Sequence, residues 1–95
     1  MSLSVYYTPI AKETFVDTYH FIQEKYGGKT ANKFKLKAEK IIDLISENPL
    51  MYKSSNIAEN VRVGYITKQT ALFYRVSSDS IHLLFFWDNR QDPIS

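Results

Sequence analysis

The chain has 95 residues, the size of one small domain, and 44% hydrophobic with 23% charged residues excludes a disordered or collagen-like chain. No apolar run approaches the ~20 residues that a membrane-spanning helix needs, and there is no cysteine for disulfide or thiol chemistry. The formal net charge of +2 is too small to indicate nucleic-acid binding by itself. We expect a single cytoplasmic domain over residues 1–95 that has no membrane partner.

The N-terminal part of the chain predicts a strand and a helix. Residues 3–7 alternate and contain β-forming side chains, which is typical of a strand. Thr8 and Pro9 have the composition of a helix start, with Thr8 as the N-cap. Four apolar residues then recur at helical spacing and are expected in the core, namely Phe15, Tyr19, Ile22 and Tyr26. Gly27 and Gly28 should end this helix.

A second helix is predicted over residues 30–47, before Asn48-Pro49 ends it. Its apolar stripe consists of Phe34, Ala38, Ile41 and Ile45. Between Lys25 and Lys40 there are six lysines and only one acid, Glu39. A solvated helix face is the commoner meaning of such a run, and binding to a phosphate or an acidic partner is the alternative.

The second half of the chain predicts β-structure. Residues 50–60 are loop-like, and from Val61 the apolar period changes from 3.6 to 2. Residues 61–66, 71–76 and 81–87 are predicted strands, the last of them apolar on both faces as in a buried strand. We therefore predict an α+β fold in which a helical hairpin covers one face of a four-stranded, mainly antiparallel sheet, in the order β-α-α-β-β-β.

Few residues suggest catalysis or metal binding. No nucleophile or carboxylate is spaced to orient His20 or His82, so a structural role is favoured over that of a general base for both. There is no cysteine, no His-x-x-x-His pattern and no clustered carboxylate motif, which argues against a metal site. The three glycines, Gly27, Gly28 and Gly64, form no phosphate-binding loop. We expect no cofactor.

The arginines are the stronger candidates. Arg62 alternates with Val61 and Val63, so if the helices cover the valine face, Arg62 lies on the open face of the sheet. Arg90 follows just after the last strand. Outward guanidinium groups could hold a phosphate or an acidic peptide, because their planar fork pairs with oxyanions. The equally weighted alternative is that each arginine pairs with a nearby acid such as Asp88 or Asp92.

The closing segments resemble a known family. Residues 71–76 read ALFYRV, Ser78 and Asp79 follow as a turn, and residues 81–93 form an apolar strand that ends in DNRQDP. This pattern, together with the element order, is similar to the RelE/ParE superfamily of bacterial type II toxin–antitoxin toxins, and the similarity covers nearly the whole chain. The resemblance implies a cytoplasmic toxin, often called a plasmid-stabilisation protein, that inhibits growth and is neutralised by a cognate antitoxin.

The resemblance also implies two branches. RelE-like members cleave mRNA on the ribosome with basic residues on the sheet and a C-terminal tyrosine, and ParE-like members act on DNA gyrase. One basic position of the RelE-like site matches Arg62 and another matches Arg90, but the central arginine matches Ala71. The chain also ends five residues after Arg90, which leaves no position for the tyrosine. Since the loss of one oxyanion donor costs ~100- to 1000-fold in rate, the ParE-like interpretation is favoured.

The resulting hypothesis is a ParE-like toxin that binds its target, with DNA gyrase as the implied partner. The expected target-binding residues are Arg62, Arg90, Trp87 and Asp88. The expected antitoxin-binding residues are Phe21, Lys33, Lys37 and Lys40, which suit an acidic amphipathic segment. The enzyme alternative is a RelE-like endoribonuclease, with ribosome and mRNA as partners, whose site is rebuilt around Arg62, Arg90 and Lys68. A non-toxic binding module of the same fold is the third hypothesis.

Overall fold

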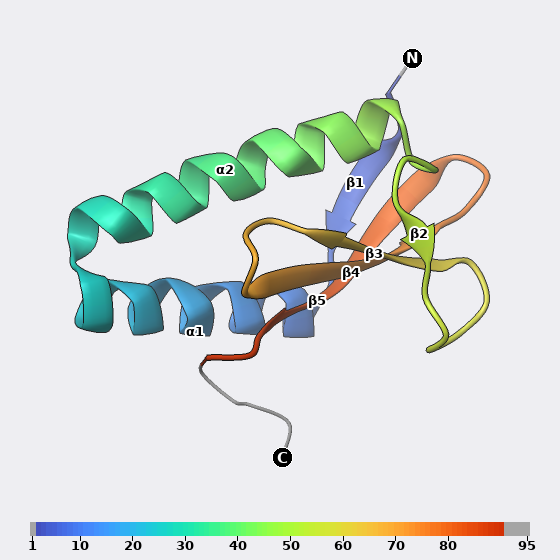
Figure 1. Cartoon of the computed structure of the whole chain (residues 1–95). Helices are drawn as coiled ribbons and strands as arrows, with labels where there is room; N and C mark the ends of the chain where they lie inside the picture. Colours follow the sequence, from blue (N-terminus) through green and yellow to red (C-terminus); the bar gives the residue numbers. More distant parts are fainter. Residues whose placement is uncertain (1, 91–95) are drawn as a thin grey trace.

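The computed structural model describes residues 2–90, which form a helical layer and a sheet (Figure 1). The helical layer is a hairpin of α1 (Pro9–Tyr26) and α2 (Gly28–Glu47). The strands are β1 (Ser4–Tyr7), β2 (Lys53–Ser54), β3 (Val61–Tyr65), β4 (Thr70–Val76) and β5 (Ser80–Asp88). The predicted α+β class and the packing of the hairpin on the sheet are confirmed.

The sheet has five strands in the order β1-β5-β4-β3-β2, one more than predicted. β1 is parallel to β5, and the other neighbours are antiparallel. The additional strand is β2, which lies inside the segment predicted as a loop. Its Lys53 and Ser54 pair with Val63 and Arg62 of β3. Two residues are too short for an alternating pattern to appear in the sequence, so only pairing with β3 identifies this strand.

Local signals determine where the helices begin and end. The Thr8 hydroxyl accepts a hydrogen bond from the backbone N–H of Ala11, which confirms it as the N-cap of α1. Gly27 has φ +96°, a left-handed conformation that glycine adopts without strain, and it separates the two helices. α2 ends at Glu47, before Asn48.

Within residues 2–90 no helix is both long and apolar enough to cross a membrane.

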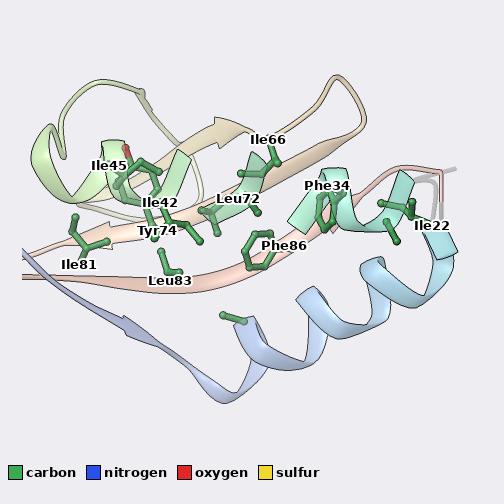
Figure 2. Close-up of a cluster of buried hydrophobic side chains, with 13 residues drawn as sticks. Ile22, Phe34, Ile42, Ile45, Ile66, Leu72, Tyr74, Ile81, Leu83 and Phe86 are labelled. Carbon is green, nitrogen blue, oxygen red and sulfur yellow. The ribbon is translucent and has the colours of Figure 1, made fainter. Parts of the chain in front are cut away.

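The hydrophobic core lies between the hairpin and one face of the sheet, here called the covered face. Figure 2 shows its side chains extending from Ile22 and Phe34, near the helix junction, to Ile45 and Ile81. Phe15 and Tyr19 are only partly buried against this core. Tyr26 was predicted to be a core residue, and this is wrong, because its side chain at the end of α1 is 52% exposed.

The opposite face of the sheet, here called the open face, carries the alternate residues of the same strands. On β4 and β5 it presents the stacked rings of Phe73 and Phe85, whose centroids are 4.5 Å apart. The cross-strand pairs Ala71–Trp87 and Arg75–His82 lie on either side of these rings. β5 is therefore apolar on both faces, as its sequence predicted. One set of its apolar side chains packs in the core beneath the helices, and the other lies on the open face.

Candidate functional site

Arg62 lies on the covered face of the sheet, which differs from the prediction. Its cross-strand partner on β4 is Tyr74, a fully buried core residue, and its Nη1 donates to the backbone carbonyl of Tyr52 at 2.6 Å. Val63 instead pairs with Phe73 on the open face. The condition for an outward Arg62, that the helices cover the valine face, is therefore not met, and the guanidinium group is directed to a backbone carbonyl of the protein itself.

The neighbours of Arg62 explain this orientation. Gly64, two residues further along β3, lies so close to the Tyr52 ring that a Cβ atom would be 2.6 Å from it. The glycine therefore admits Tyr52 to the covered face, and the segment that follows α2 packs there. The Tyr74 hydroxyl donates to the Pro49 carbonyl at 3.0 Å, and burial raises the Tyr74 pKa, an effect that the nearby Arg62 partly opposes. Arg62 thus joins this segment to β3.

Asp88 closes the other end of the covered face. Its side chain is fully buried, and its carboxylate accepts hydrogen bonds from the Thr70 hydroxyl and from the backbone N–H and side chain of Arg90. Burial alone raises the pKa of Asp88, but the hydrogen bonds from Arg90 and Thr70 outweigh it and hold the pKa below its ordinary value. The carboxylate of Asp88 is thus enclosed by the fold and holds Arg90 in place, whereas its contact with a target stays a prediction.

Arg90 is held in place by Asp88 and by two aromatic rings of α1. Its Nη2 and Nε donate to the two carboxylate oxygens at 2.8 and 3.1 Å. Its guanidinium carbon lies 5.4 Å from the Tyr26 ring centroid and 5.9 Å from that of Phe21. The bonds to Asp88 raise the Arg90 pKa. The predicted pairing of Arg90 with an acid is therefore observed with Asp88, whereas Asp92 lies outside the described residues.

Two further candidates have different surroundings from those expected. Phe21 was predicted as an exposed contact for the antitoxin, but it is partly buried against the core as well as lying beneath Arg90. Trp87 is partly buried on the open face, opposite Ala71 of β4.

Ala71, where the resemblance places a catalytic arginine, thus points to the open face without a charge. Arg75 is exposed there, and the His82 ring stacks on Tyr6 at 5.4 Å.

The three lysines expected to bind an antitoxin are all exposed on α2. Lys33 and Lys37 line a cleft of about 250 Å³ between α2 and the turn that joins β3 to β4, and Arg90 lines the same cleft. We call it the cationic cleft. The sequence did not predict this convergence, because 53 positions separate Lys37 from Arg90.

Three exposed apolar side chains on the hairpin were not predicted from the sequence. Leu36, Ile10 and Val16 are 65%, 57% and 47% exposed. A signal for Leu36 was present, since it lies between two lysines and outside the apolar stripe of α2. An exposed apolar side chain between two lysines suits contact with an acidic amphipathic segment.

Comparison with known proteins identifies the fold. No family model matches the sequence, and no curated protein is significantly similar to it. Among solved structures, a chain of the chromosomal ParDE toxin–antitoxin system from P. aeruginosa is similar at TM-score 0.77 and 15% identity, over 92% of this chain and 96% of that one.

Two further structures show the same architecture. The YoeB dimer from Staphylococcus aureus gives a TM-score of 0.63 at 18% identity, covering 92% of this chain and 97% of that one. The toxin–antitoxin complex RelBE2 from Mycobacterium tuberculosis gives 0.62 at 15% identity, covering 93% and 99%. The predicted RelE/ParE-like fold is thus confirmed across nearly the whole chain.

Proposed function

We propose that this chain, which has the RelE/ParE toxin fold, is the toxin of a type II toxin–antitoxin module and inhibits growth by binding its target. The observation that carries the proposal is the likeness to a chain of a ParDE system over 96% of that chain. Several unrelated activities can share one fold, so the mode of action is argued from the residues. A plasmid-stabilisation role and a cytoplasmic location accompany this proposal.

Binding is favoured over mRNA cleavage by the positions where a RelE-like nuclease would place cations. One of them is Ala71, which has no charge to stabilise a phosphorane. Arg62 donates to the Tyr52 carbonyl on the covered face, and Arg90 is paired with the buried Asp88. A catalytic set rebuilt around Arg62, Arg90 and Lys68 is disfavoured, because the two arginines lie toward opposite ends of β4. Arg62 is opposite Tyr74, whereas Asp88, which holds Arg90, is opposite Thr70.

DNA gyrase is the first target to test, because this target follows from the resemblance to the ParE-like branch. Arg90, which remains 27% exposed, and the partly buried Trp87 are the proposed contacts. The nuclease alternative retains one supporting observation: Arg75 and His82 are cross-strand partners on the open face. A cation next to an imidazole is a pair that phosphodiester cleavage could use.

The proposed antitoxin contributes an acidic amphipathic segment that lies on the hairpin. Lys33, Lys37 and Lys40 would pair with its acidic side chains, and Leu36 would take part in its apolar contact. Such binding should weaken as salt rises, because exposed charges are screened. Salt-insensitive binding to a neutral segment would contradict the electrostatic part of this proposal.

Controlled expression in bacteria tests the function. We expect growth arrest with long unsegregated cells and DNA-damage signalling, and rescue by the product of a small reading frame upstream of the gene. Arg90→Gln should relieve the arrest, and Lys12→Gln, on an exposed position of α1, is the matched control. Normal growth at high soluble yield would contradict toxicity. Codon-positioned cuts in translated mRNA, seen by primer extension, would favour the nuclease instead.

A further inference from the structure

The cationic cleft is lined by four parts of the fold, and two of them are tied together. The four parts are the N-terminal half of α2, Ile22 of α1, the turn between β3 and β4, and Arg90. The backbone N–H of Asn89 donates to the Gln69 carbonyl at 3.1 Å, which joins the turn to the segment that carries Arg90. Arg90 is itself fixed by Asp88. Two walls of the cleft therefore keep their relative positions without a ligand.

The charge of the cleft is unbalanced. Lys33, Lys37 and Arg90 line it, and no Asp or Glu does so among the described residues. The buried carboxylate of Asp88, behind Arg90, offsets one of these three charges and leaves two. A phosphate monoester carries about −1.5 to −2 charges at pH 7, whereas a carboxylate carries one. The charge of the cleft thus matches a terminal phosphate better than a single acidic side chain.

The neutral groups of the cleft also suit an oxyanion with several oxygens. Thr30, Thr67 and Gln69 line it together with the cations. The Thr67 Oγ1 accepts hydrogen bonds from the backbone N–H groups of Gln69 and Thr70, at 3.2 and 3.1 Å. A hydroxyl whose oxygen accepts two bonds retains its proton as a donor. Hydroxyl and amide donors beside lysines and an arginine can together engage the three terminal oxygens of a phosphate.

We propose that the cationic cleft is a binding site for the terminal phosphate of a nucleotide or of a nucleic-acid strand. Lys33 and Lys37 supply mobile charges, Arg90 supplies a pre-positioned guanidinium, and the turn supplies neutral donors. This site goes beyond the proposed function, because phosphate binding can be measured whether or not the chain is toxic. In a toxin, it would place the phosphate next to Arg90, the residue proposed to contact the target.

The test is a titration of the ¹⁵N-labelled protein, followed by NMR, and by calorimetry for affinity. The probes are inorganic phosphate, AMP, an RNA hexamer with a 5′-phosphate, the same hexamer with a 5′-hydroxyl, and a peptide of six glutamates. We expect the amide signals of Thr30, Lys33, Lys37, Thr67 and Gln69 to shift. Lys33→Gln/Lys37→Gln should weaken binding by about tenfold or more, since each lysine loses a charge-assisted bond.

The matched control is Lys12→Gln/Lys35→Gln, which removes the same charge from exposed helical positions outside the cleft. It should change the affinity less than about twofold, the effect of screened surface charge. AMP binding without hexamer binding would identify a free nucleotide as the ligand, and preference for the phosphorylated hexamer would identify a strand end. Either result supports the site.

Three results would overturn the proposal. The 5′-hydroxyl hexamer would bind as tightly as the phosphorylated one if only general charge attraction acts on the strand. The glutamate peptide would bind as tightly as AMP if Lys33 and Lys37 serve only the acidic segment of the proposed antitoxin and the cleft does not also hold a phosphate. The control variant would lose as much affinity as the cleft variant if any pair of helix lysines suffices. Each result leaves the growth assay unaffected, so failure of the phosphate site and failure of the toxin assignment are distinguishable.

Discussion

The two arginines that the sequence marked as equivalent lie in contrasting environments toward opposite ends of β4. Arg62 reaches a neutral acceptor, the Tyr52 carbonyl, inside the layer formed by the segment after α2. Arg90 reaches a buried carboxylate and two rings of α1, and it also lines a cleft with two lysines. The difference teaches that the acceptor decides the role of a guanidinium group. The Arg62 guanidinium joins two segments of the fold, whereas the Arg90 guanidinium forms part of a proposed binding surface.

The largest effect is expected at the Arg90 end. Asp88→Asn removes the charge that the hydrogen bonds from Arg90 and Thr70 stabilise, within a fully buried side chain. Breaking a buried pair costs ~3–5 kcal/mol, and the partial exposure of Arg90 lowers the expected loss of unfolding free energy to about 2–3 kcal/mol. Urea denaturation measures it. Asp79→Asn, on an exposed turn, should lie within about 0.5 kcal/mol of the wild type.

Acidification should reproduce part of this loss. The pKa of Asp88 is lower in the folded than in the unfolded protein, so its ionised form stabilises the fold above the unfolded pKa, about 3.9. That stabilisation disappears as the pH falls through the folded pKa. The unfolding free energies of wild type and Asp88→Asn should differ by a constant amount above about pH 5 and converge below it. A difference that persists undiminished at pH 2.5 would contradict the proposed charge effect.

A smaller effect is expected where the Arg62 end is closely packed. Gly64→Ala would place a Cβ atom 2.6 Å from the Tyr52 ring, and such overpacking costs about 1–3 kcal/mol. Gly28→Ala is the control, because a Cβ atom there meets nothing within 4 Å. It should be neutral or stabilising by up to about 1 kcal/mol, as expected in a helix. Equal losses from both substitutions would show that the cost at Gly64 does not come from contact with Tyr52.

Helices and long strands could be predicted from the sequence because their signals are local. Thr8 caps α1 and Gly27 ends it, and both features depend on neighbouring residues alone. The alternating residues of β3 also predicted a strand, but the outward direction of Arg62 was predicted wrongly. That choice depends on Tyr52, which packs over Gly64 from outside the strand, and a period of two fixes which residues share a face without fixing which face is buried.

The candidate site was predictable only in part, for the same reason. The pairing of Arg90 with Asp88 was one of the two alternatives predicted from the sequence, because Asp88 is only two residues away and the contact is local. The cationic cleft instead depends on how α2 lies relative to the turn between β3 and β4. The sequence pattern of either segment does not show where the other segment lies. The burial of Phe21 beneath Arg90 was missed likewise, since it depends on how the end of β5 meets α1.

The smallest effect is expected for Arg62→Met, which tests whether the two arginines have the contrasting roles described above. Methionine keeps an apolar stem but leaves the Tyr52 carbonyl without the bond from Arg62, and the loss of one such bond costs about 1 kcal/mol. Arg75→Met, on the exposed open face, should cost less than about 0.5 kcal/mol. In the growth assay Arg62→Met should remain toxic, while Arg90→Gln should not. A folded Arg62→Met protein that no longer arrests growth would assign target contact to Arg62, because its stability loss is too small to deplete the native state.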